Sequence, residues 1–283
     1  MKKSILSGFF ISLMILFPVI AGAESLSHPN SAESAKLSEA SCADGFSFVV
    51  MADTHVDQTI FPVMRDGAAT MHPDFFVSVG DSTNNGLEDE YATFLGMIGK
   101  VKTPWFVAPG NHEYRQDKGG PSQEKMKLFK KIFGKSDFAF THCGWKFIIV
   151  DIVKMDSLLS DQLRWIEREL KGYEGRAAVF MHYPPAVLEK WKEGYWVMNG
   201  KEFLKLLESD RVPYFFSGHL HEYDHLRLGP TEYIVTGGGG GGFDADAATD
   251  PLYAPDGGPF HHFIYVTVNG DKTSYFVVRP GGE

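Results

Sequence analysis

The sequence predicts a single domain of the α/β class. Short runs of β-branched and aromatic residues with continuous apolar character alternate with stretches of helical periodicity. Strands of this kind are buried on both faces, which is typical of sheets covered by helices. The chain has 283 residues, of which 43% are hydrophobic and 22% charged, so it can bury one large core and is neither disordered nor fibrous. We find no internal repeat in it.

The order of the elements follows from these patterns. The predicted strands are residues 46–52, 75–79, 105–108, 145–150, 177–181, 214–216, 233–236, 263–268 and 274–278. The predicted helices are residues 60–71, 87–99, 123–133, 161–170 and 201–207. Ser160 is a good N-cap for the helix that follows it. Asn269-Gly270-Asp271 predicts a hairpin between the last two strands.

The first residues carry an export pattern. Two lysines precede an apolar run over residues 5–20, and Ala21-Gly22-Ala23 follows it. This pattern predicts a signal peptide over residues 1–23; the alternative is an uncleaved membrane anchor, for which the run is slightly short. Residues 24–43 are polar and aperiodic and predict a flexible leader, which leaves residues 44–283 for the domain. We therefore expect a periplasmic or secreted protein without a stable membrane anchor after cleavage.

Export bears on the two cysteines of the chain, Cys42 and Cys143. In an oxidising compartment they could form one disulfide that closes a long loop, which would stabilise the fold. The alternative is two unpaired thiols, because the geometry of a disulfide cannot be derived from spacing alone.

The charge balance limits the partners. The chain has 27 basic and 36 acidic residues, a net charge of −9, and removal of residues 1–23 takes away two lysines and leaves −11. Repulsion from the phosphate backbone then disfavours a nucleic-acid partner, and small phosphoesters fit better. The oligomeric state cannot be predicted from the sequence.

Metal-capable side chains follow five of the predicted strands. The blocks are Asp53-Thr54-His55, Gly80-Asp81, Gly110-Asn111-His112-Glu113, His182 and Gly218-His219-Leu220-His221. The carboxyl ends of strands in an α/β sheet form the usual ligand site, so seven side chains are expected to converge there. These are Asp53, His55, Asp81, Asn111, His182, His219 and His221. Each of them alone is more often a cap, a turn or a packed residue, but the five ordered blocks together predict a metal site.

The ligand chemistry favours two ions. Imidazole with carboxylate suits zinc, iron or manganese, and seven ligands are too many for one tetrahedral site. Two ions that share a carboxylate can clamp the attacking and leaving oxygens of a phosphoryl transfer. We therefore expect two divalent or transition metal ions per chain, of unknown identity.

These blocks resemble the signature of the calcineurin-like metallophosphoesterases. The resemblance implies a two-sheet β-sandwich flanked by helices, with a dinuclear metal site at the carboxyl ends of the strands. Carried over, Asp53, His55 and His221 would hold one ion, Asn111, His182 and His219 the other, and Asp81 would bridge them. A bridging hydroxide would attack phosphorus in line, and the family's non-ligand histidine, His112, would stabilise the phosphoryl oxygens or protonate the leaving group.

The sequence departs from two branches of the family at Asn84. Residues 218–223 and 233–238 resemble purple acid phosphatases, but those enzymes carry an iron-binding Tyr three residues after the bridging Asp. Protein Ser/Thr phosphatases carry an Asp there, followed by Arg, to orient the active-site histidine. Asn84-Asn85 replace both, so an iron(III) preference is not expected and the support of His112 is weaker.

Further residues near the expected site could serve function, but each also has a common structural role. Asp57, Asn84, Asp151 and Tyr183 could support the ligands, although capping or turn roles are the more common outcome. The run of glycines 237–242 could cradle phosphate, but it lacks the Lys-Ser/Thr ending of a P-loop, so close packing against the site is the preferred interpretation. Trp191, Tyr195 and Trp196 could stack on a nucleoside or sugar, or cover an apolar edge.

The prediction for function is an exported, metal-dependent phosphoesterase acting on phosphomonoesters or small phosphodiesters. An envelope scaffold that binds metal with little turnover is the alternative, and a nuclease is a weaker one.

Overall fold

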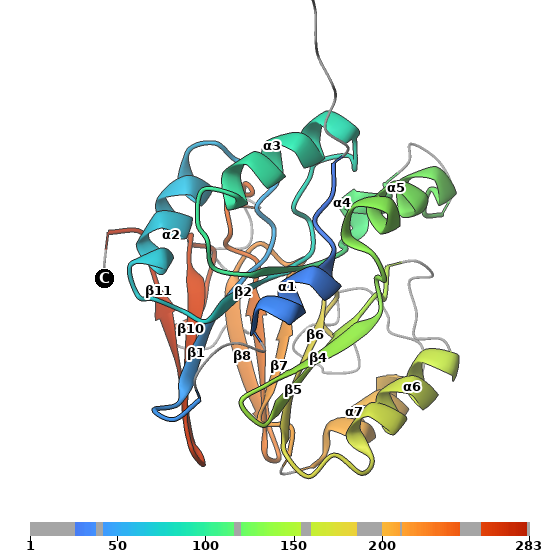
Figure 1. The fold of residues 1–283 in the computed structure, drawn as a ribbon, viewed down its shortest axis with the longest axis vertical. Helices are drawn as coiled ribbons and strands as arrows, with labels where there is room; N and C mark the ends of the chain where they lie inside the picture. Colours follow the sequence, from blue (N-terminus) through green and yellow to red (C-terminus); the bar gives the residue numbers. More distant parts are fainter. Residues whose placement is uncertain are drawn as a thin grey trace, which may run out of the picture.

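The computed structural model describes residues 26–37, 42–115, 120–153, 160–185, 200–209, 211–243 and 256–281. Two β-sheets pack face to face, and helices cover their outer faces (Figure 1). One sheet has the strand order β11-β10-β1-β2-β3 and the other β4-β5-β6-β7-β9-β8. This is the two-sheet sandwich that the family resemblance implied, a narrower architecture than the α/β class alone.

The first sheet combines parallel and antiparallel pairs. Strands β1 (Phe46–Met51), β2 (Phe75–Val79) and β3 (Trp105–Ala108) are parallel. The hairpin of β10 (Phe263–Asn269) and β11 (Lys272–Val278) adds to the other side of β1, antiparallel, with Gly270 and Asp271 in the predicted turn. Helices α2 (Ile60–Ala69) and α3 (Glu88–Ile98) follow β1 and β2.

The second sheet has four parallel strands at its centre. They are β5 (Trp145–Val150), β6 (Arg176–Met181), β7 (Tyr214–Ser217) and β9 (Thr231–Thr236). Antiparallel edge strands β4 (Phe138–His142) and β8 (Tyr223–Leu228) complete it. Helices α6 (Ser160–Leu170) and α7 (Gly200–Leu207) follow β5 and β6, while α4 (Asn111–Tyr114) and α5 (Gln123–Phe133) precede β4.

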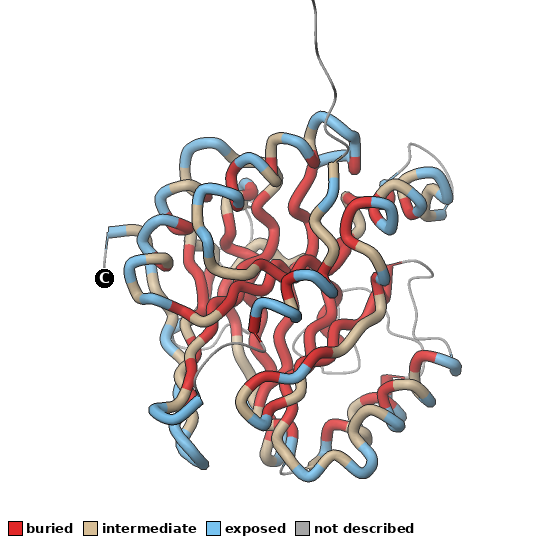
Figure 2. Tube along the Cα trace, in the orientation of Figure 1, coloured by how far each residue is buried: buried red, intermediate tan, exposed pale blue. Residues whose placement is uncertain are grey.

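The apolar runs of the strands fill two layers of core. Phe48 of β1 points between the sheets, where its ring centroid lies 5.4 Å from that of Phe147 and 6.2 Å from that of Phe216. Its neighbours in β1, Val49 and Met51, point outward beneath the helices. Because both faces are buried, as the red strands of Figure 2 show, polar residues cannot alternate along them. The continuous apolar runs are the direct result.

The expected flexible leader is wrong over residues 30–37, which form helix α1 (Asn30–Leu37). The Asn30 side-chain amide donates to the Val107 carbonyl at 3.0 Å, and the Val107 N–H donates to Asn30 Oδ1 at 2.9 Å. Strand β3 is the edge of its sheet, so this side chain supplies hydrogen bonds that a further strand would give. The polar sequence of α1 does not predict this tertiary contact.

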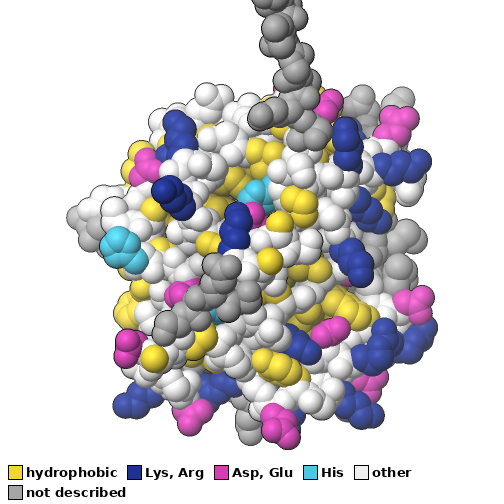
Figure 3. Space-filling model, viewed as in Figure 1, with side chains coloured by type: hydrophobic (Ala, Val, Ile, Leu, Met, Phe, Trp, Pro, Cys, Tyr) yellow, Lys and Arg dark blue, Asp and Glu magenta, His cyan; other side chains and the backbone are white. Residues whose placement is uncertain are grey.

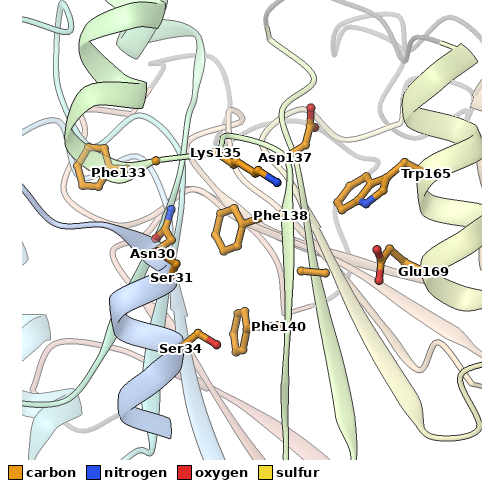
Figure 4. Close-up of a pocket in the computed structure, with 12 residues that line it drawn as sticks. Asn30, Ser31, Ser34, Phe133, Lys135, Asp137, Phe138, Phe140, Trp165 and Glu169 are labelled. Carbon is orange, nitrogen blue, oxygen red and sulfur yellow. The ribbon is translucent and has the colours of Figure 1, made fainter. Parts of the chain in front are cut away.

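The two cysteines are paired. A Cys42–Cys143 disulfide joins the segment before β1 to the turn between β4 and β5, and thereby links the two sheets. A groove of about 600 Å³ lies between α1, β4 and α6; Phe138, Phe140 and Trp165 line it (Figure 4).

The remaining surface is mixed in charge. Figure 3 shows lysine and arginine side chains in small groups with acidic side chains between several of them. Within the described residues, no helix is long and apolar enough to cross a membrane.

Candidate metal centre

The seven predicted side chains come together at one end of the sandwich. They follow the carboxyl ends of β1, β2, β3, β6 and β7, which the parallel pairing of each sheet brings side by side. The ligand-capable atoms form three overlapping groups, each within 4.8 Å: Asp53, His55 and His221; His55, Asp81 and His112; and Asp81, His182 and His219.

The first group, the carboxylate half, consists of Asp53, His55 and His221. Nε2 of His221 lies 3.2 Å from Nε2 of His55 and 3.5 Å from Asp53 Oδ1. Asp53 is fully buried, whereas the His221 side chain is 25% exposed, so this half opens to solvent on one side.

The other half of the centre, the amide half, consists of Asn111, His182 and His219. Nε2 of His182 lies 3.0 Å from Asn111 Oδ1, and the rings of His182 and His219 are 5.3 Å apart between centroids. The His182 side chain is fully buried. His182 thus belongs to the core, whereas Asn111 and His219 are half-buried, and the oxygen ligand of this half is a neutral amide.

Asp81 lies between the two halves. Its Oδ2 is 3.4 Å from Nε2 of His182 and 3.8 Å from Nε2 of His55. Burial by itself would raise the pKa of Asp81, but the imidazoles of His182, His112 and His55 outweigh it and hold the pKa well below its usual value. Asp81 is thus a carboxylate placed to be shared by both halves.

Backbone carbonyls fix the histidine tautomers. Nδ1 of His182 donates to the Val79 carbonyl at 2.8 Å, and Nδ1 of His221 donates to the Gly242 carbonyl at 2.5 Å. A carbonyl only accepts, so the proton of each neutral ring is on Nδ1 and the lone pair of Nε2 faces the interior of the centre. Histidines that bind metals are oriented in the same way.

The residues fit metal ions. Asp53 Oδ1 is buried without a hydrogen-bond donor, and the Nε2 atoms of His55 and His221 face each other at 3.2 Å. Two lone pairs and an unpartnered carboxylate oxygen at this distance are stable only with a cation among them. Without metal that cation is a proton: burial lowers the pKa of His221, but its interaction with the Asp53 carboxylate prevails and raises it to about 9.

The same balance acts in the amide half. Burial would lower the pKa of His182, and the adjacent Asp81 carboxylate raises it to about 9. Burial, and then the charge of His182, lower the pKa of His219 to about 3, so that ring is neutral. Each half therefore holds one protonated and displaceable imidazole in the metal-free protein.

Strained backbone presents the ligands. Asp53, His55, Asp81 and His219 all have positive φ angles, between 49° and 72°, which non-glycine residues seldom adopt. Side chains of the centre compensate: the His219 N–H donates to Asp53 Oδ2 at 2.9 Å, and the His112 N–H donates to Asp81 Oδ1 at 2.8 Å. Each carboxylate thus holds the neighbouring loop in place.

Glu113 has a role that the sequence did not reveal. Its buried carboxylate accepts the backbone N–H groups of Asp81, Thr83 and Gly110 at 2.6–2.9 Å, so it ties the loop after β2 to the loop after β3. Burial, and then the charge of Asp81, raise the pKa of Glu113 to about 8. The acidic residue at the end of Gly-Asn-His-Glu was visible in the sequence, but not the N–H groups around it.

Asn84 supports a different histidine from the one expected. Its Oδ1 accepts from Nδ1 of His55 at 3.2 Å, whereas Nδ1 of His112 donates to the Asn84 backbone carbonyl at 2.6 Å. A main-chain carbonyl does not depend on the side chain at this position. Asn84 thus supports His55 through its side chain, whereas His112 has a neutral main-chain carbonyl and no carboxylate from this residue as its acceptor, so its weaker support stays a prediction.

Of the other expected neighbours, Tyr183 lies at the site, whereas Asp57 and Asp151 stabilise the fold. The ring centroid of Tyr183 is 4.7 Å from that of His219. Asp57 caps helix α2 by accepting the Thr59 N–H at 2.9 Å, and Asp151 accepts the hydroxyl of Tyr114 at 3.1 Å. The expected aromatic lip, Trp191, Tyr195 and Trp196, lies outside the described residues.

The glycine run packs against the centre. A Cβ on Gly241 would lie 2.7 Å from Cδ2 of His55 and 2.9 Å from Cε1 of His221, and a Cβ on Gly239 would lie 2.1 Å from the Ala52 carbonyl. Side chains do not fit at these positions. The preferred interpretation of residues 237–242 as a loop packed close to the site is confirmed.

Fold and site together give a two-sheet sandwich with groups of His and Asp that could hold metal ions at one end. A family model for calcineurin-like phosphoesterases matches residues 46–223, and the chain belongs to this family. Members of the family typically bind two metal ions, in agreement with the groups of His and Asp described above.

Curated relatives are distant. A probable cyclic nucleotide phosphodiesterase of Fibrobacter succinogenes is 26% identical over 58% of this chain and 63% of its own length. A probable glycerophosphodiester phosphodiesterase of Arcobacter nitrofigilis is 26% identical over 40% of this chain and 42% of its own. The match thus spans less than two thirds of either relative.

Solved structures share the fold. A purple acid phosphatase from yellow lupin seeds has a TM-score of 0.67 at 14% identity, over 84% of this chain and 52% of its own. A dimetal phosphatase from Danio rerio has a TM-score of 0.58 at 12% identity, over 83% of this chain and 96% of its own. At such identities the likeness shows the fold alone, so the resemblance to the purple acid phosphatase branch stays a prediction.

Proposed function

We propose that the protein hydrolyses small phosphodiesters, with two metal ions held by the seven side chains of the centre. Two observations carry the proposal: the seven metal-capable side chains lie together, and Oδ1 of Asp53 is buried among them without a hydrogen-bond donor. Asp53, His55 and His221 hold one ion, Asn111, His182 and His219 hold the other, and Asp81 is shared. When bound, the ions supply Lewis acidity that activates water and neutralises phosphoryl charge.

His112 is the residue we assign to the leaving group. Its Nε2 lies 3.8 Å from Asp81 Oδ2, at the centre, and its side chain is 22% exposed, so a bound substrate can reach it. Since Nδ1 donates to the Asn84 carbonyl, Nε2 is the atom that faces the substrate. An imidazolium there stabilises charge on the phosphoryl oxygens and can pass its proton to the leaving oxygen.

A diester is the preferred substrate within the phosphoester class. The relatives named as phosphodiesterases support it, since they match 40–58% of this chain, including parts of the family region. A net charge of −9 also favours small substrates over long polyanions. Phosphomonoesters are the alternative substrates.

We also propose that the protein is exported to the periplasm or secreted. The signal-like pattern over residues 1–23 supports this, and so does the Cys42–Cys143 disulfide, since such bonds persist mainly in oxidising compartments. Fractionation of cells that express the full chain tests it; an uncleaved protein in the cytoplasmic fraction contradicts export.

The test of activity compares four substrates on manganese-loaded protein: p-nitrophenyl phosphate, its bis ester, a 3′,5′-cyclic nucleotide and a glycerophosphodiester. We expect the diesters to turn over faster than the monoester. His182→Ala should abolish activity, whereas His225→Ala, a histidine on β8 that pairs with Asp256 at 3.2 Å, should retain it. Equal rates for wild type and His182→Ala contradict the proposal, and two bound ions without turnover on any substrate favour a metal-binding scaffold.

A further inference from the structure

The opposite end of the sandwich carries a histidine–carboxylate pair beside the disulfide. His142 is the last residue of β4, and Cys143 with Gly144 forms the two-residue turn into β5. Nε2 of His142 lies 3.4 Å from Cys143 Sγ and 3.6 Å from Asp74 Oδ1. The pair lies at the amino ends of β1 and β2, whose first residues pack against His142, whereas the metal centre lies at their carboxyl ends.

The surroundings hold the imidazole in this position. The His142 side chain is 2% exposed, and its ring packs edge-on against Phe46 and Phe75 with centroids 5.2 Å and 5.8 Å away. Asp74 is itself fixed, because its Oδ2 accepts the Ser47 N–H at 2.9 Å. The carboxylate of Asp74 and the sulfur of Cys143 therefore both lie next to the same ring nitrogen, Nε2 of His142.

The two sulfurs of the disulfide are not equivalent. Cys42 is exposed to solvent, whereas Cys143 is half-buried and has the imidazole at its Sγ. In a thiol–disulfide exchange the accessible sulfur is attacked, and the sulfur whose thiolate is better stabilised leaves.

We propose that Cys42–Cys143 is a thiol-exchange site for low-molecular-weight thiols, with Cys42 as the attacked sulfur and Cys143 as the leaving sulfur. The incoming thiolate forms a bond to Cys42 Sγ while the Cys42–Cys143 bond breaks. The electron pair of that bond leaves on Cys143 Sγ as a thiolate, which can accept a hydrogen bond from Nε2 of His142. The products are a mixed disulfide on Cys42 and a reduced Cys143, so no further oxidant or reductant is needed.

The exchange would release the covalent link between the sheets. The cysteines are 101 residues apart, and Cys42 connects helix α1 to strand β1. The site is independent of the proposed hydrolysis, because no ligand of the metal centre contacts these sulfurs among the described contacts.

Glutathione is a suitable probe. The oxidised protein is incubated with it, quenched by alkylation and mapped by mass spectrometry; we expect glutathione on Cys42 and the alkyl group on Cys143. Asp74→Asn should slow the opening on the order of fivefold, because it replaces the carboxylate that holds Nε2 of His142 beside the leaving sulfur, while the amide oxygen can still accept from the Ser47 N–H. His142→Gln should slow it at least as much.

The matched control is His72→Asn, an exposed histidine near Asp74 whose replacement should leave the rate unchanged. Adducts found mainly on Cys143 overturn the proposal. Equal opening rates for wild type and Asp74→Asn overturn it as well. If His142→Gln does not form the disulfide, the Asp74→Asn rate decides alone.

Discussion

The carboxylate half and the amide half of the metal centre differ in the charge of their oxygen ligands. The amide half has neutral Asn111, whereas Asp53 adds a negative charge to the carboxylate half. In burial they are alike, since each has one fully buried member, Asp53 or His182, and two half-buried ones. Ligand charge strongly tunes cation affinity, and Asp81 lies between the two halves. We therefore expect the carboxylate half to retain its ion more firmly.

The largest effect is expected for Asp81, the carboxylate that lies between the two halves. Asp81→Ala removes the carboxylate shared by both halves, so both ions should be lost and hydrolysis of bis-p-nitrophenyl phosphate should fall by about 10³-fold or more. Metal content and steady-state rates measure this. A variant that keeps two ions, or more than a tenth of the activity, contradicts a shared Asp81.

The charge difference can be reversed by two single substitutions. Asp53→Asn should weaken the ion of the carboxylate half by about 10–100-fold, and Asn111→Asp should strengthen the other ion, since each changes one ligand charge. Competition with a chelator gives both affinities. If Asp53→Asn leaves the two affinities as they were, ligand charge does not determine retention.

Asn84 sharpens the comparison because it supports only one half. Asn84→Ala removes the acceptor of His55 Nδ1, so the affinity of the carboxylate half alone should fall by about tenfold. His112 should keep its orientation, because it donates to the main-chain carbonyl of the same residue. An equal loss in both halves, found in the same chelator competition, would be inconsistent with this assignment.

The smallest effect is a pH dependence that both halves share. In metal-free protein the pKa values of His182 and His221 are raised to about 9, above the unfolded value of about 6.5. Their contribution to stability is full below pH 6.5 and is lost as the pH rises through 9. Metal affinity should rise over the same range, because each ion displaces a proton.

Thermal unfolding of metal-free protein between pH 6 and pH 9 measures the stability change. His182→Gln and His221→Gln should each flatten part of the slope. A stability that rises toward pH 9 contradicts the raised pKa values.

The sequence predicts those parts of the centre that depend on strand order. Asp53, Asp81 and His182 each follow a continuous apolar strand, and parallel pairing necessarily brings such ends together. The contacts of Asn84 could not be predicted in this way, because its side chain and its main-chain carbonyl accept from two different histidines. Only the path of its loop decides this, and loop paths are not encoded in periodicity.

The same limit explains two of the elements that were missed, helix α1 and strand β8; strand β4 was missed as well. Helix α1 depends on Asn30 meeting the open edge of β3, and edge strand β8 carries Asp224, His225 and Arg227, which obscure its apolar pattern. Both elements are specified by tertiary contacts rather than by local propensity. The disulfide likewise required the distance between two segments 101 residues apart.

The central claim is a centre of two ions, one in each half. Metal content per chain of wild type, His182→Ala and His221→Ala, measured after identical loading and dialysis, tests it most directly. We predict two ions in the wild type, one in His182→Ala retained by the carboxylate half, and at most one in His221→Ala. A wild type that holds a single ion, or either variant that still holds two, would contradict the account.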